Sequence, residues 1–143
     1  MKIYTIGFTR KSAEEFFNKL CKAGVKRIID VRLYNTRQLA GFAKKNHLPY
    51  FLQVICGIDY LHRLELAPTE DILKAYKQDG DWSVYERKFR SLMAKRRIEK
   101  TVPRSICDGA CLLCAEDKPH HCHRRLVAEY LREKWGNVEI IHL

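Results

Sequence analysis

Short apolar runs near both ends of the chain predict buried β-strands. Residues 2–7 (KIYTIG) are mostly apolar and end at a glycine, and residues 27–32 (RIIDVR) form a second apolar run between charges. Between the two runs, Ser12 followed by Glu15 has the form of a helix capping box. The apolar stripe of this helix consists of Phe16, Phe17, Leu20 and Cys21. The order of strand, helix and strand predicts a βαβ unit with parallel strands.

The end of the chain repeats this order. We expect a strand within residues 106–114, centred on CLLC, then a helix over residues 119–135 that starts at Pro119, then a strand over residues 138–143. The expected elements of the middle are helices over residues 38–45, 49–56, 69–77 and 82–97 and an extended segment over 58–62. The pattern therefore predicts one α/β domain over residues 1–143, a three-layer sandwich whose mainly parallel sheet is built from two βαβ units with an inserted helical middle.

Composition and charge narrow the class of protein. The 143 residues, 46% hydrophobic and 31% charged, fit one soluble domain. No signal-peptide pattern is present and the longest apolar stretch is interrupted, so we expect a cytoplasmic location and no membrane partner. The formal charge of +10 favours an anionic small molecule or a nucleic acid as partner, although a solvated basic surface explains it equally well. None of these features predicts an oligomeric state.

The six cysteines call for separate interpretations. In a chain of this class they are expected to be thiols rather than a disulfide framework, with a single bridge of the kind that some thermophile proteins carry left as an alternative. Cys21 and Cys56 lie on apolar helix faces and are assigned to the core. The remaining candidates for chemistry lie in the stretch LLCAEDKPHHCHRR, residues 112–125, at the end of one predicted strand and the start of the next helix.

Polar side chains are expected to meet at one edge of the sheet. Ligands of open parallel sheets bind beyond the carboxyl ends of the strands. Gly7, Asp30, Arg32, Cys114 and Glu116 all lie at such ends. Side-chain alternation puts Asp30 and Arg32 on the same face, either as a structural ion pair or as a base and an anion clamp. The candidate catalytic groups are Asp30, Cys114 and Glu116, and the candidate anion-binding residues are Gly7, Arg32, Arg37 and Arg124.

A metal site and a reactive thiol both stay open. Cys111 and Cys114 are three residues apart on a strand and should face opposite sides, so they do not share an ion. A smaller site formed by Cys114 and Cys122 with His121 or His123 remains an alternative, and no other cofactor is indicated. Alternatively, Cys114 is a thiolate facing a helix N-terminus, or a buried core cysteine whose acidic neighbours raise its pKa.

Several motifs resemble one known family. They are TIGFT (5–9), IDVR (29–32), GIDYLH (57–62), LAPT (66–69), LLCAE (112–116) and CHR (122–124). Together they resemble the family called domain of unknown function 488, although the commoner family pattern has His in place of Phe8 and Pro-x-Ser in place of Asn35-x-Arg37. The resemblance implies an α/β sandwich and no known activity. The residues that match the family motifs are Gly7, Asp30, Arg32, Tyr60, His62, Cys114, Glu116, Cys122, His123 and Arg124.

Two hypotheses about function follow. The first is an enzyme with an anion-binding pocket at the carboxyl edge of the sheet, acting on a nucleotide or nucleic acid, with Tyr60, His62, Cys122 and His123 as further pocket residues. The second is a non-catalytic nucleic-acid-binding domain whose Cys/His cluster is structural and whose basic helices contact phosphate.

Overall fold

The computed structural model describes residues 1–35 and 41–143, and within them five strands form one all-parallel sheet. The strand order is β3-β2-β4-β1-β5. The strands are β1 (Lys2–Gly7), β2 (Arg27–Asp30), β3 (Asp59–His62), β4 (Ala110–Cys114) and β5 (Glu139–His142). In register, Gly7 pairs with Cys114 and Asp30 pairs with both Leu113 and His62. The carboxyl ends of these strands therefore meet at one edge, as the sequence predicts.

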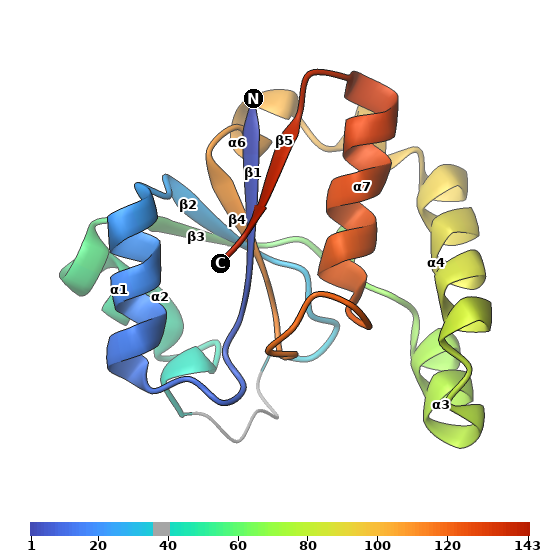
Figure 1. Ribbon diagram of the computed structural model, residues 1–143, viewed down its shortest axis with the longest axis horizontal. Coiled ribbons are helices and arrows are strands. Elements are labelled where there is room, and N and C mark those ends of the chain that lie inside the picture. The colour runs from blue at the N-terminus through green and yellow to red at the C-terminus, as the bar shows by residue number, and fades with distance from the viewer. Residues whose placement is uncertain (36–40) are drawn as a thin grey trace.

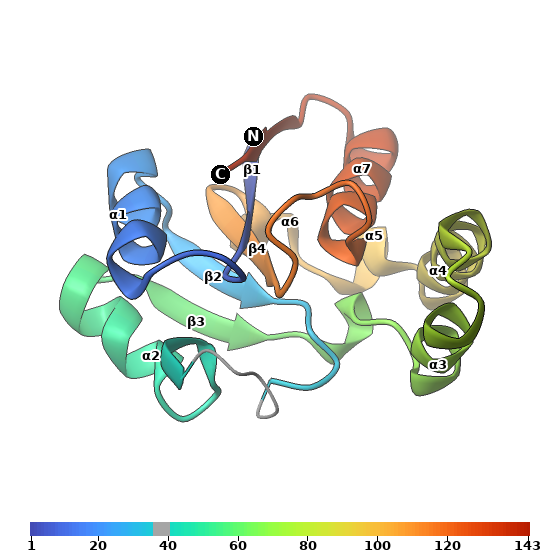
Figure 2. The same ribbon diagram turned by 60° about the horizontal axis from the view of Figure 1, so that its bottom comes forward.

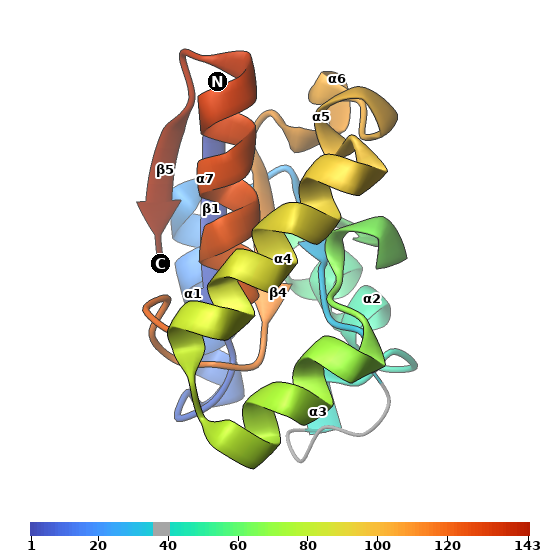
Figure 3. The same cartoon turned by 90° about the vertical axis from the view of Figure 1, so that its right-hand side faces the viewer.

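Helices cover both faces of the sheet and make three layers (Figures 1 and 2). One face packs against α1 (Ala13–Ala23), α2 (Leu48–Phe51) and the π-helical turn η2 (Leu52–Cys56). The other face packs against α7 (His123–Trp135) and α4 (Trp82–Arg96), and α3 (Glu70–Asp79) packs on α4 (Figure 3). The shorter helices are η1 (Gly41–Ala43), η3 (Leu64–Leu66), α5 (Ile98–Thr101) and α6 (Arg104–Cys107). The predicted three-layer α/β sandwich is confirmed.

Alternation along the central strands divides the core in two. Leu112 belongs to the cluster under α4 and α7, and Leu113 belongs to the cluster under α1. Cys111 and Cys114 likewise fall into opposite clusters, which confirms that they cannot share a ligand. All five residues of β4 are buried because helices cover both faces, and this explains its uninterrupted apolar sequence.

Side chains cap the starts of three helices, and the first of these caps was predicted from its capping box. The Ser12 hydroxyl accepts a hydrogen bond from the backbone N–H of Glu15 at the start of α1, and the Thr69 hydroxyl accepts one from Ile72 at the start of α3. Asp81 caps α4 in the same way. These contacts satisfy N–H groups that the first helical turn leaves unpaired.

Three sequence expectations are corrected, and the short helix α6 was not expected. Helix α7 begins at His123 rather than Pro119, because the Pro119 carbonyl accepts the Cys122 N–H in a turn that precedes the helix. Strand β2 ends at Asp30 rather than residue 32, because the Asp30 carboxylate accepts the Arg32 N–H and turns the chain. Residues 104–107 form the short helix α6 before β4. Of the helix expected over residues 38–45, the described part contains only the 3₁₀ turn Gly41–Ala43, and residues 38–40 lie outside the described residues.

Cys21 and Cys56 form a disulfide bond between α1 and the end of η2, so their assignment as core thiols is wrong. Cys21 lies at the margin of the buried stripe of α1 and is exposed. Cys107, Cys111, Cys114 and Cys122 are buried free thiols. Among the described residues, no helix is long and apolar enough to cross a membrane.

Candidate functional site

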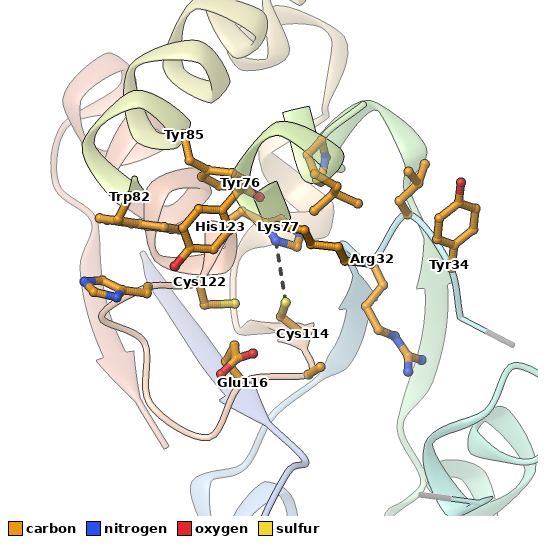
Figure 4. A pocket seen from close by; sticks show the side chains of 15 residues that line it. Arg32, Tyr34, Tyr76, Lys77, Trp82, Tyr85, Cys114, Glu116, Cys122 and His123 are labelled. Atoms are coloured by element: carbon orange, nitrogen blue, oxygen red, sulfur yellow. Dashed lines mark hydrogen bonds between the residues drawn. The ribbon is translucent and has the colours of Figure 1, made fainter. Parts of the chain in front are cut away.

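A cavity of about 450 Å³ lies beyond the carboxyl end of β4, between the sheet edge and the α3–α4 pair (Figure 4). Cys114, Cys122 and His123 line one side of it. Tyr76 and Lys77 of α3 and Trp82 and Tyr85 of α4 line another. The remaining lining residues are Arg32, Leu33, Tyr34, Pro68, Leu73, Ala115, Glu116 and His121. The volume falls within the usual range for small-molecule sites.

Three potential ligand side chains converge at the cavity. Cys114 is the last residue of β4, Cys122 precedes α7 as its N-cap residue, and His123 is the first residue of α7. The two sulfur atoms and a ring nitrogen of His123 all lie within 4.8 Å of one another, and all three residues are buried. The Cys114 Sγ lies 3.5 Å from the His123 Nδ1. We call these three residues the thiol–imidazole cluster.

The tautomer of His123 is fixed by the backbone. Its Nε2 lies 2.6 Å from the carbonyl oxygen of Val31. A carbonyl oxygen can only accept a hydrogen bond, so Nε2 carries a proton and donates it. The edge of the Phe89 ring holds the imidazole from the side, with ring centroids 5.5 Å apart. In the neutral imidazole, Nδ1 therefore has a free lone pair that faces the two thiols.

The two thiols of the cluster differ in acidity. A hydrogen bond from Cys122 lowers the pKa of the Cys114 thiol, and the Arg124 guanidinium and the backbone N–H groups of Ala115 and Glu116 act in the same direction against burial. Burial and the neighbouring Cys114 sulfur raise the pKa of Cys122 well above its usual value. Cys114 therefore ionises before Cys122.

Aromatic rings of α3 and α4 form another part of the cavity wall. The Trp82 ring stacks on Tyr85 with centroids 4.8 Å apart and on His121 with centroids 5.1 Å apart. Tyr76 packs against both Trp82 and Tyr85, at 5.6 and 5.2 Å. Tyr76, Trp82 and Tyr85 fall within two of the expected middle helices, and helical spacing does not reveal that these helices line a cavity at the sheet edge.

Two candidate anion-binding residues instead hold the loop after Cys114. Arg124 is 1% exposed and donates hydrogen bonds to the carbonyl oxygens of Glu116 and Asp117. Gly7 lies against the same loop, where an added Cβ would fall 1.6 Å from the Glu116 carbonyl oxygen. Neither residue lines the cavity. Both fix the loop that carries Glu116, an exposed residue that also lines the cavity and is labelled in Figure 4.

Asp30 and Arg32 form a buried ion pair. The Arg32 Nε and Nη2 donate to the two Asp30 carboxylate oxygens at 2.9 and 2.8 Å, and Nη2 also donates to the Ala43 carbonyl oxygen. The guanidinium lies 5.2 Å from the centre of the Phe8 ring and points away from Cys114 (Figure 4). Its Nη1 is buried and has no hydrogen-bond partner among the residues that the structure describes. The backbone turn at Arg32 thus reaches the cavity while its charge is held elsewhere.

Tyr60 and His62 extend this ion pair into a larger cluster. The Tyr60 hydroxyl donates to Asp30 at 2.5 Å and accepts a hydrogen bond from the Asn35 side chain at 3.0 Å. Asn35 also lies 3.2 Å from the His62 Nδ1, while the His62 Nε2 lies 2.7 Å from the Arg32 carbonyl oxygen and donates to it. Burial and the adjacent Asp30 raise the pKa of Tyr60. We call Asp30, Arg32, Asn35, Tyr60 and His62 the carboxylate cluster.

The predicted site residues thus separate into two clusters, with Gly7 and Arg124 supporting the loop beside one of them. Tyr60 and His62 belong to the carboxylate cluster and do not line the cavity. Arg37 lies outside the described residues. The Asn35 side chain, which the sequence presents only as part of a motif, contacts both Tyr60 and His62. A single sequence does not show that residues so far apart in the chain are in contact.

Comparison with known proteins identifies the family. No curated protein and no solved structure matches the chain significantly. A family described as domain of unknown function DUF488 matches residues 12–131, which include both clusters. This confirms the resemblance drawn from the motifs, and the chain belongs to the DUF488 family.

Proposed function

We propose that the protein is an enzyme that acts in the cavity beside the thiol–imidazole cluster, on a ligand with a planar ring and negative charge such as a nucleotide or an exposed nucleic-acid base. One observation carries this proposal. The cavity at the carboxyl edge of a parallel sheet is lined by aromatic rings together with buried thiols and an imidazole. Apolar cavities with a few convergent polar groups at this position in the fold are the usual sites of ligand binding.

The wall supports a planar ligand. Base stacking on aromatic side chains tolerates any base and stabilises binding by about 1–3 kcal/mol per base. Trp82 is already stacked on both faces, by Tyr85 and by His121, so Tyr76 is the ring best available to a ligand. Lys77 lines the same cavity, and the net charge of +10 draws anions to the surface.

The chemical groups of the proposed reaction are Cys114 and Glu116. Both line the cavity, and Glu116 is exposed and able to exchange protons with water. Asp30 is fully buried and accepts hydrogen bonds from Arg32 and Tyr60, so we assign it a positioning role. Arg32 and Arg124 hold backbone and carboxylate groups in place, and the phosphate contact is assigned to Lys77 instead.

Binding of nucleoside monophosphates and of a short single-stranded oligonucleotide, measured by calorimetry, tests this proposal. Tyr76→Ala should weaken binding about tenfold, because about 1.4 kcal/mol of stacking is lost. Tyr50→Ala is the matched control, since the Tyr50 side chain is 64% exposed and lies outside the cavity. Absence of binding to every probe, or equal binding by the two variants, would refute the proposal.

A groove of about 390 Å³ on the outer side of α3 and α4 supports a second candidate, a nucleic-acid-binding domain. Its lining residues include Arg87, Lys88 and Lys95. Lysine and arginine side chains that neutralise phosphates release counterions, so binding of this kind falls steeply with salt. Salt-sensitive duplex binding that Lys88→Glu weakens and Tyr76→Ala leaves unchanged would favour this candidate.

A further inference from the structure

The thiol–imidazole cluster has the composition of a transition-metal site. Thiolate sulfur and imidazole nitrogen are the ligands that zinc takes most often in proteins. Cys114, Cys122 and His123 come from the end of β4 and the start of α7, so the fold itself brings them together. A pair of reactive thiols would not need the imidazole, whereas a metal site uses it as a third ligand.

The distances fit tetrahedral coordination. Zinc bonds of about 2.3 Å to sulfur and about 2.0–2.1 Å to nitrogen place neighbouring sulfur and nitrogen ligands about 3.6 Å apart. The Cys114 Sγ lies 3.5 Å from the His123 Nδ1. All three ligand atoms lie within 4.8 Å of one another, so small side-chain rotations complete the site. From this geometry we infer that Cys114, Cys122 and His123 bind a zinc ion.

The surroundings of His123 match those of a metal ligand. A ligating histidine commonly donates its other ring N–H to a carboxylate or a backbone carbonyl, which fixes the ring orientation. The Nε2 of His123 donates to the Val31 carbonyl oxygen in this way, and Phe89 packs its ring edge against the imidazole. The nitrogen left to bind a metal, Nδ1, is the one that faces the two sulfur atoms.

The fourth coordination position opens onto the cavity. Zinc sites with three protein ligands and one open position are typical of catalytic zinc, whereas structural zinc is closed by four. All three ligand residues line the cavity wall. His121, the nearest further histidine in sequence, is stacked on Trp82 and belongs to the aromatic part of the wall. A water or a substrate atom would therefore complete the coordination.

This site gives the proposed enzyme a reaction class. A zinc ion acidifies a bound water, and Glu116 is the carboxylate at the cavity that can exchange protons with it. The reaction would then be a hydrolysis, in which the water oxygen bonds to the substrate, one substrate bond breaks, and the leaving group takes up the proton that Glu116 removed from the water. This catalytic meaning rests on the proposed function, whereas zinc binding itself does not.

Metal analysis of the full chain, purified without a histidine tag, tests the inference. We expect about one equivalent of zinc, as for a single site with three protein ligands. Cys122→Ser and His123→Gln should each lower the zinc affinity by at least about 100-fold, more than the usual loss from changing a residue that only supports a ligand. Cys107→Ser is the matched control, because Cys107 is also a buried free thiol and lies outside the cluster.

X-ray absorption of the zinc-loaded protein gives a second readout that does not depend on a variant folding. Two sulfur ligands and one imidazole ligand at zinc-bond distances are expected. Failure of the wild-type protein to bind added zinc, or equal loss from Cys107→Ser and Cys122→Ser, would overturn the inference. Zinc binding without nucleotide binding would support the metal site and refute the proposed function. Nucleotide binding without zinc binding would support the proposed function and refute the metal site.

Discussion

Two polar clusters lie at the same edge of the sheet, and they differ in how fully their acceptor atoms are hydrogen-bonded, although the Arg32 Nη1 donor of the carboxylate cluster has no partner among the described residues. In the carboxylate cluster, Asp30 accepts hydrogen bonds from the Arg32 backbone, from two Arg32 side-chain nitrogens and from Tyr60. In the thiol–imidazole cluster, the His123 Nδ1 lies 3.5 Å from the Cys114 sulfur, and its hydrogen-bond partners are thiols rather than charged groups. In the carboxylate cluster, the residues themselves satisfy the Asp30 carboxylate. In the thiol–imidazole cluster, the residues that carry the sulfur atoms and the His123 Nδ1 line a cavity.

The extent to which acceptor atoms are already hydrogen-bonded distinguishes a structural cluster from a chemical one more clearly than the types of residue in it. Buried charge is costly unless it is paired and hydrogen-bonded, so a saturated carboxylate is what a stable sheet edge requires. The carboxylate cluster also fixes the chain beyond β2 by holding the Ala43 carbonyl oxygen. Soft ligand atoms with free lone pairs beside a cavity are instead available to a metal or a substrate.

The largest expected effect comes from opening the carboxylate cluster. Arg32→Met leaves the Asp30 carboxylate buried without its ion-pair partner, and we expect a loss of about 3–5 kcal/mol in the free energy of unfolding. Urea denaturation measures this loss. Zinc binding by the remaining folded protein should persist, because Arg32 holds no atom of the thiol–imidazole cluster.

Arg90→Met serves as the control for that change. Arg90 makes ion pairs with Glu86, Glu129 and Glu133, but its side chain is 30% exposed. Partly exposed pairs of this kind contribute about 1 kcal/mol or less. Equal destabilisation by the two variants would mean that the buried pair has no special importance and that the contrast between the clusters is wrong.

A smaller effect is expected from crowding the loop beside the thiol–imidazole cluster. Gly7→Ala places a Cβ 1.6 Å from the Glu116 carbonyl oxygen, which forces the loop after Cys114 to move. Overpacking of this kind costs about 2–3 kcal/mol, and the same shift should weaken zinc binding. Thermal unfolding and zinc titration measure the two effects.

Gly41→Ala is the matched glycine control, because an added Cβ at Gly41 meets no atom of the described residues within 4 Å. It should change neither stability nor zinc affinity. If Gly7→Ala destabilised the protein but left zinc affinity unchanged, the loop after Cys114 would not position the cluster, and the proposed roles of Gly7 and Arg124 would be limited to stability.

The sequence predicts the strands that carry the two clusters, but it does not predict which cluster has its acceptor atoms fully hydrogen-bonded. Apolar runs predict the parallel strands, and the ends of those strands place Asp30, Cys114 and Glu116 on one edge. The distinction between saturated and free polar atoms depends on partners far along the chain. Tyr60 reaches Asp30 across 30 positions, and His123 reaches the Val31 carbonyl across 92. Hydrophobic periodicity carries no signal for such contacts.

Two further differences have local causes. The start of α7 was predicted too early, because Pro119 suits a helix start and a turn equally well, and the turn leaves Cys122 outside the helix beside Cys114. Arg124 looked like an anion-binding residue because it lies near a helix N-terminus, yet it binds the carbonyl oxygens of its own loop. An arginine next to a loop can donate hydrogen bonds to backbone carbonyl oxygens as readily as it can bind an anionic ligand.

The smallest expected effect comes from removing one donor of the carboxylate cluster. Tyr60→Phe deletes the hydrogen bond to Asp30, which should cost about 1.5 kcal/mol at neutral pH, the usual value for a bond to a charged group. Denaturation at several pH values measures it. Burial and Asp30 raise the pKa of Tyr60 above its ordinary value of 10.0. The unfolded tyrosine therefore loses its proton first, and wild-type stability should fall as pH rises above 10.0.

Because phenylalanine does not ionise, the difference between wild type and Tyr60→Phe should shrink as pH rises above 10.0. Tyr50→Phe removes a hydroxyl from an exposed ring and should leave stability at neutral pH unchanged. A loss from Tyr60→Phe no larger than that from Tyr50→Phe would show that Arg32 alone satisfies Asp30. The carboxylate cluster would then be a simple ion pair, and the side chains of Asn35 and His62, which are linked to Asp30 through Tyr60 and Arg32, would add nothing to it.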